Sequence, residues 1–166
     1  MSVATAVPLS EYLNTTYRPD CDYLEGELLE RNVGEWDHSL LQIELAAALH
    51  ALKRKLGIIT VTEQRVQVKT RRFRIPDIAV LKRRPATGIV TEPPFLCVEI
   101  LSPDDRMVEM RERVNDYLEF GVPYIWVIDP KSRLTTVYTA DGMHEISNGI
   151  LSTRDPDITV DLNALE

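Results

Sequence analysis

The strongest constraint on the fold is a succession of short, apolar, β-branched segments that is interrupted by a helical pattern. Each segment has the composition of a strand. In chain order they are IITVTEQRVQVK (58–69), FRIPDIAVLK (73–82), FLCVEILS (95–102) and VPYIWVIDP (122–130). One helix is predicted before them, over 37–56, and another over 104–120. This order predicts an α/β (α+β) fold in which helices pack on one mixed sheet.

Several residues mark where these elements begin and end. Asp37 is the predicted N-cap of the first helix, and Gly57 is placed to end it. Gly121 ends the second helix in the same way. Two hairpins are predicted, one over 21–31 and one over 134–147, and the second has an Asp-Gly turn.

Composition is that of an ordinary globular protein. The chain has 166 residues, of which 44% are hydrophobic and 27% charged, enough for one domain over 1–166 with a buried core. Cys21 and Cys97 make neither a disulfide framework nor a zinc site. The N-terminus has no signal-peptide pattern, and no apolar run is long enough to span a membrane. We therefore expect a cytoplasmic protein that does not associate with membranes.

Positive charge is concentrated in KTRRFRIPDIAVLKRR (69–84), which holds seven of the 19 basic residues of a chain with net charge −7. A local basic patch attracts phosphate-bearing ligands, because charges act over a screening length of about 8 Å. Most charge runs are merely solvated, and alternate residues of a strand point to opposite faces. The candidates for contact with substrate phosphates are Lys69, Arg71, Arg72, Arg74 and Lys82.

Two carboxylates interrupt apolar strand segments. Asp77 lies in RIPDIAVL and Glu99 in FLCVEILSP. A buried carboxylate is costly unless it is paired, hydrogen-bonded or bound to a metal, and neighbouring strands would present both at one point. Mg²⁺ or Mn²⁺ takes oxygen ligands of this kind. We expect a divalent metal site here; the alternatives are an edge-strand kink at Asp77 and a salt bridge from Glu99 to an arginine of 106–113.

An ordered series of motifs resembles a known family. IPDIAV (75–80), VEILSP (98–103), Tyr117 and GVPYIWVIDP (121–130) resemble the Uma-two type of restriction endonucleases, within the PD-(D/E)XK nuclease superfamily. DYLEGEL (22–28) adds to the resemblance, which covers most of 9–139. It implies a restriction-endonuclease-like mixed sheet flanked by helices. It also implies a Mg²⁺-dependent endonuclease that hydrolyses phosphodiester bonds in DNA, acting as a homodimer.

The resemblance also implies roles for particular residues. Asp77, Glu99 and the carbonyl of Ile100 would hold the metal. The superfamily lysine, two residues after the glutamate, is replaced by Leu101, and the resembled family supplies a lysine where this chain has Arg113. Arginine keeps the positive charge but cannot act as a neutral amine. Supporting candidates are Glu27, His38 and Glu44, although a satisfied histidine at a helix start explains His38 equally well.

Two other functions stay open. Arg113, Leu101 and the acidic balance favour a catalytically degenerate nuclease-fold protein that binds nucleic acid or a protein without cutting. A small-molecule phosphoesterase would use the same metal without a long basic groove. The salt dependence of binding distinguishes a nucleic-acid ligand from a small substrate. The affinity for a ligand with several phosphates falls on the order of tenfold between roughly 50 and 200 mM salt, whereas the affinity for a small substrate changes little.

Overall fold

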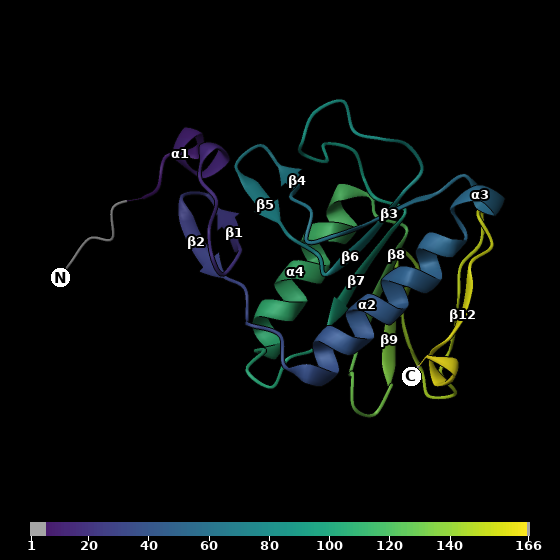
Figure 1. Cartoon of the computed structure of the whole chain (residues 1–166). Coiled ribbons are helices and arrows are strands. Elements are labelled where there is room, and N and C mark those ends of the chain that lie inside the picture. The colour runs from purple at the N-terminus through teal and green to yellow at the C-terminus, as the bar shows by residue number, and fades with distance from the viewer. Residues whose placement is uncertain (1–5, 166) are drawn as a thin grey trace.

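The computed structural model describes residues 6–165, and within them the strands form three sheets (Figure 1). The helices are α1 (Leu9–Asn14), α2 (Trp36–Ala51), α3 (Lys53–Leu56), α4 (Met107–Phe120) and the 3₁₀ turn η1 (Leu162–Ala164). The strands are β1 (Cys21–Leu24), β2 (Glu27–Glu30), β3 (Ile59–Thr62), β4 (Val66–Lys69), β5 (Arg72–Arg74), β6 (Ile78–Leu81), β7 (Leu96–Ile100), β8 (Tyr124–Ile128), β9 (Thr135–Thr139), β10 (Gly142–Ile146), β11 (Ile150–Ser152) and β12 (Thr159–Asp161).

The central sheet has six strands in the order β10-β9-β8-β7-β6-β3. β7 and β8 are parallel, and the other neighbours in the sheet are antiparallel. The predicted mixed sheet is therefore confirmed. The parallel pair requires a crossover, and α4 makes it, because the chain runs from β7 through α4 to β8.

The prediction of one sheet was wrong. Each of the segments 58–69 and 73–82 forms two strands instead of one, and the halves join different sheets. β3 and β6 join the central sheet, whereas β4 and β5 join a second sheet in the order β2-β1-β5-β4. The chain leaves the central sheet just after β3, at Glu63, whose φ of 50° is incompatible with a continuous strand. β11 and β12 form a third, two-stranded sheet.

The two faces of the central sheet are covered by different elements. Leu41, Leu45 and Leu49 of α2 pack on one face, together with the C-terminal ribbon of β11 and β12. α4 and β4 pack on the other face. In Figure 1, α2 crosses in front of the sheet, and the sheet formed around β1 and β2 lies at the opposite side from the C-terminal ribbon. The result is a sheet buried between helical layers, as the α/β prediction requires.

The predicted helix over 37–56 is two helices. α2 begins one residue before Asp37, Glu35 precedes it as N-cap without a side-chain hydrogen bond, and the helical hydrogen bonding breaks at Leu52 before α3. Gly57 ends α3 with a φ of 67°, and Gly121 ends α4 with a φ of 103°, so both predicted stops are confirmed. Among residues 6–165 no helix combines the length and apolarity needed to cross a bilayer.

Candidate functional site

The antiparallel register of β6 and β7 brings the two carboxylates of Asp77 and Glu99 together. Ile78 pairs with Val98 and Ala79 with Cys97, so Asp77, immediately before β6, lies opposite Glu99. Alternate residues share a face, so both carboxylates lie on the face that α4 covers. Both are buried. Sequence analysis predicted this meeting, and the geometry confirms it.

The carboxylates meet at a residue that sequence analysis did not single out. One guanidinium nitrogen of Arg31, Nη2, lies 2.9 Å from Asp77 Oδ1 and 3.0 Å from Glu99 Oε2. Arg31 directly follows β2. Burial opposes its charge, but the two carboxylates raise the pKa of Arg31 well above its ordinary value. The sequence indicates that a buried carboxylate pair needs a cation. It does not indicate which arginine supplies that cation.

Asp77 has further partners that fix its orientation. Its Oδ2 accepts a 2.7 Å hydrogen bond from the backbone N–H of Ile100, and His38 Nε2 lies 3.5 Å from the same oxygen. Burial alone would raise the pKa of Asp77, but Arg31, His38 and the N–H bond outweigh burial and hold the pKa below its usual value. Asp77 is therefore held as an anion. In return it raises the pKa of His38, against the effect of burial.

Glu99 has two partners on α4. The hydroxyl of Tyr117 donates a 2.6 Å hydrogen bond to Oε1, and Arg113 Nη1 lies 3.4 Å from Oε2. Burial raises the pKa of Glu99, and Arg31 and Arg113 offset this only in part. Burial also raises the pKa of Tyr117 well above its ordinary value, so Tyr117 stays a neutral donor. The salt bridge from Glu99 to the helix, which was the alternative reading, is present.

Arg113 contacts both the carboxylate pair and the β1–β2 hairpin. Its Nη2 donates to Asp22 Oδ2 at 3.2 Å, while Nη1 reaches Glu99. Its side chain is 6% exposed. The position that carries the lysine in the resembled family therefore does place a positive charge beside the carboxylate pair. That charge is already shared with Asp22.

Two members of the basic run, Arg72 and Arg74, face the acidic side of α4 and not open solvent. Arg74 is fully buried, and it pairs with Asp116 of α4 at 2.7 Å and with Asp22 at 3.1 Å. Contact between Arg74 and a substrate phosphate, expected from the sequence, is therefore contradicted, because the guanidinium is enclosed and has carboxylate partners. Arg72 pairs with Asp116 at 2.8 Å and with Glu112 at 2.9 Å. Much of the positive charge that stood out in the sequence is neutralised within the fold.

The remaining candidates lie apart from the carboxylate pair. Lys69 is about half exposed and pairs with Glu119 at 2.7 Å. Lys82 donates to the backbone carbonyl of Asp155 and lies over the ring of Phe95. Arg71 is exposed in the turn between β4 and β5.

The two glutamates named as supporting candidates have no bond to Asp77 or Glu99. Glu27 is exposed at the turn end of the β1–β2 hairpin, whereas Arg31 follows the opposite end. Glu44 is half-buried on α2, and its Oε2 atom is enclosed without a hydrogen-bond partner.

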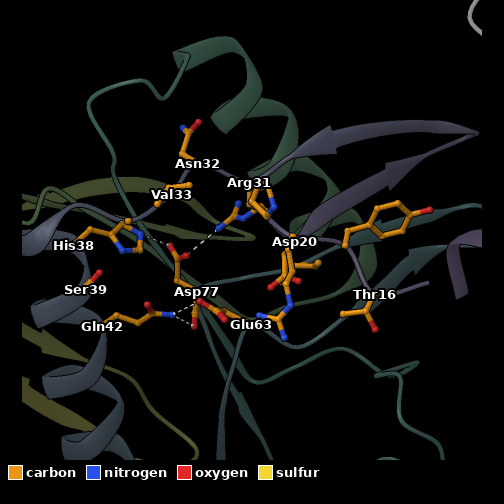
Figure 2. Close-up of a pocket in the computed structure, with 15 residues that line it drawn as sticks. Thr16, Asp20, Arg31, Asn32, Val33, His38, Ser39, Gln42, Glu63 and Asp77 are labelled. Carbon is orange, nitrogen blue, oxygen red and sulfur yellow. Dashed lines mark hydrogen bonds and ion pairs between the residues drawn. The ribbon is translucent and has the colours of Figure 1, made fainter. Parts of the chain in front are cut away.

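A cavity of about 470 Å³ adjoins the site (Figure 2). Its charged and polar lining comes from the segment before β1, the segment after β2 and the start of α2, together with Glu63 and Asp77. Arg31, His38 and Asp77 line it, so the carboxylate is reached from this side. Figure 2 shows His38 and Arg31 directed at Asp77 from opposite sides, and Gln42 directed at the Asp77 backbone, to which it donates a 3.0 Å hydrogen bond. The cavity has the size of small-molecule or single-nucleotide sites.

The residues present fit a divalent cation. Oxygens of Asp77 and Glu99 converge on one nitrogen of Arg31, so a positive charge already stands at the point that both carboxylates face. Within residues 6–165, no group of three or more His, Cys, Asp or Glu is arranged to hold a metal ion. Mg²⁺ does not require such a group, because it binds through one or two carboxylates and completes its octahedron with water and substrate oxygens.

The comparisons with known proteins agree with the fold. A family model described as "Uma2: Putative restriction endonuclease" matches residues 9–161. No curated protein matches. The crystal structure of a protein from Anabaena variabilis, described as a "putative nuclease belonging to DUF820", is 21% identical and covers 96% of this chain and 97% of its own, with a TM-score of 0.82. At that identity the likeness establishes the fold.

Proposed function

The chain belongs to the Uma2 family, and from this premise we propose that it is a Mg²⁺- or Mn²⁺-dependent endonuclease that hydrolyses phosphodiester bonds in DNA. The observation that carries the proposal is the convergence of Asp77 and Glu99, from adjacent central strands, on a single cation position. Two ionisable carboxylates buried at one point are costly unless they are paired with cations or bind a metal, and such arrangements concentrate at functional sites.

The proposed ligands are the carboxylates of Asp77 and Glu99 and the backbone carbonyl of Ile100. When bound, the metal lowers the pKa of a coordinated water and polarises the scissile phosphate. His38 and the Ile100 N–H fix the Asp77 carboxylate, and Tyr117 fixes that of Glu99. These bonds hold both ligands in orientation before metal arrives, which lowers the cost of organising the site.

Arg113 has the proposed role of stabilising charge on the phosphate. It lies beside Glu99 and always carries its proton, so it acts by electrostatics and hydrogen bonding and not as a base. Of the residues predicted to contact phosphates, Lys69, Arg71 and Lys82 are exposed enough to contact a DNA backbone. Lys69 would have to leave Glu119 to do so.

The test is cleavage of plasmid and single-stranded DNA with Mg²⁺ or Mn²⁺. We expect metal-dependent cutting by the wild type, and a loss of at least about 100-fold in Asp77→Asn and Glu99→Gln, because each removes an anionic metal ligand while keeping its shape. Arg113→Lys should keep activity, since it preserves the charge. Glu92→Gln is the matched control, because Glu92 is exposed and pairs only with Arg83 in the described structure. Cutting that survives in both carboxylate variants would contradict the proposal.

A second function, binding without cutting, is favoured by one specific observation. Arg31 satisfies both carboxylates, and Arg113 is shared between Glu99 and Asp22, so the charges are balanced within the protein. A purely structural ion-pair network would have the same form. This second function would be established in place of the nuclease if the protein neither cuts DNA nor binds Mn²⁺ but still binds DNA, measured by fluorescence anisotropy.

A further inference from the structure

We propose that Arg31 occupies the divalent-cation position itself, so that a metal enters the site only as the Arg31 guanidinium leaves it. This inference rests on the proposed metal-dependent function. Its basis is that a single nitrogen, Nη2, lies within hydrogen-bond distance of Asp77 and Glu99 at once, 2.9 and 3.0 Å away. A guanidinium and a metal ion cannot share the oxygens of both carboxylates at one point.

The balance of charge favours replacement of the Arg31 guanidinium by the metal over binding of the metal beside it. In their ionised forms Asp77 and Glu99 carry two negative charges, and Arg31 and Arg113 contact them with two positive charges. Adding a divalent cation while Arg31 stayed would leave excess positive charge in a buried space, where charges interact strongly. If Arg31 withdraws as the metal binds, the excess is reduced and the carboxylates remain paired.

Of the two arginines that contact the carboxylate pair, Arg31 has more space to move. Its side chain is 13% exposed, compared with 6% for Arg113. It lines the cavity of about 470 Å³ beside Asp77. The Arg31 backbone N–H donates a 2.7 Å hydrogen bond to the Asp20 carbonyl and stays fixed there, so the exchange needs only a rotation of the long Arg31 side chain.

The displaced guanidinium would have a second role inside the cavity. From a position in the cavity, Arg31 would remain close to Asp77 and could pair with a phosphate that approaches the metal. The residue is therefore a positioning residue with two states: it holds the carboxylates together without metal, and it turns toward the polyanion with metal bound. Metal and phosphate binding should then assist each other, because each favours the same position of Arg31.

The experiment is calorimetric titration of the full chain with Mn²⁺, without DNA. Arg31→Gln should bind Mn²⁺ tighter than wild type by about tenfold or more, since the competing cation is gone. Arg83→Gln, which removes an exposed arginine paired with Glu92, should leave Mn²⁺ affinity unchanged. A merely structural Arg31 would give the opposite sign, because its loss would loosen the ligands. Equal or weaker Mn²⁺ binding by Arg31→Gln therefore overturns the exchange.

A second measurement covers the case in which Arg31→Gln is unstable without metal. Thermal unfolding followed by circular dichroism should then show that Mn²⁺ raises the melting temperature of Arg31→Gln more than that of wild type, because the ion supplies the missing positive charge. An Arg31→Gln protein that stays unfolded in millimolar Mn²⁺ contradicts the exchange. Wild type that binds Mn²⁺ and cuts DNA, with no gain in Arg31→Gln, refutes the exchange alone. If neither protein binds Mn²⁺, the proposed function fails as well.

Discussion

At the scale of single residues, the site depends on neutral and cationic donors that keep two carboxylates buried. Tyr117 is the neutral donor, with a 2.6 Å bond to Glu99 Oε1. Tyr117→Phe should destabilise the protein by about 1.5–3 kcal/mol, because it leaves a buried carboxylate oxygen without its donor. Urea unfolding measures this. Tyr124→Phe is the control, because Tyr124 accepts an ordinary 3.1 Å bond from the Arg154 backbone; an equal loss in both variants would contradict a special role for the Glu99 bond.

The residues of the site differ in how far the sequence reveals them. Asp77 and Glu99 could be predicted, because a carboxylate inside an apolar strand segment has few explanations. Arg31 could not, because its long side chain reaches the carboxylates from a hairpin 46 positions before Asp77 along the chain. Asp22 was missed for a similar reason: it pairs with Arg74 and Arg113 across contacts that no local pattern encodes.

At the scale of elements, helix and strand type followed from composition, whereas the pairing of strands did not. Each of the segments 58–69 and 73–82 has an unbroken strand composition, and yet the chain turns within it. The turn in the first follows β3 at Glu63, and the second breaks at Ile75 and Pro76, where proline cannot donate to a ladder. Long-range packing decides which sheet receives each half, so sequence patterning could not predict it.

The turn after β8 carries a pH-dependent contribution to stability. Asp129 Oδ1 accepts hydrogen bonds from the backbone N–H groups of Lys131 and Ser132, at 2.9 and 3.3 Å. Slight burial raises the pKa of Asp129, but the N–H bonds outweigh it and the pKa lies below the ordinary 3.8. A lowered pKa means stability that is present above the ordinary value and is lost as pH falls through the folded value.

Asp129→Asn keeps the shape of this turn and removes the charge. We expect a loss of about 0.5–1 kcal/mol at neutral pH, and a difference from wild type that stays constant down to a pH of about 4.5 and shrinks below about 3.8. Urea unfolding at several pH values measures it. A difference that does not change between neutral pH and about pH 3 would show that the charge on Asp129 contributes nothing to the turn.

At the scale of the whole molecule, buried ion pairs connect the four-stranded sheet β2-β1-β5-β4 to α4, which covers one face of the central sheet. Arg74 of β5 pairs with Asp116 of α4 and Asp22 of β1, and it is fully buried. Arg74→Gln should cost about 3–5 kcal/mol, because it takes a fully buried cation away from two buried carboxylates and leaves each with one arginine partner, Arg72 for Asp116 and Arg113 for Asp22. Arg83→Gln, at an exposed pair with Glu92, should change stability by no more than about 0.5 kcal/mol. Similar losses in the two variants, measured by urea unfolding, would contradict this assignment.

The same network explains part of the positive charge in 69–84. Arg72 and Arg74 pair with carboxylates of α4 and so stabilise the fold, whereas the other five basic residues of this stretch are exposed. A homodimer, a single domain over 1–166 and a cytoplasmic location stay predictions.

The register between β6 and β7 has a consequence for which insertions and deletions the chain can accept. Asp77 and Glu99 meet because they lie opposite each other on antiparallel strands. Changes of length in the loop 82–94 leave this pairing intact where they fall in its exposed parts, away from Val90, which is buried and pairs with β4. One residue added within β7 before Glu99 would instead turn its carboxylate to the α2 face, among Leu41, Leu45 and Leu49. Insertions and deletions among natural relatives should therefore be found in that loop and be absent from β6 and β7.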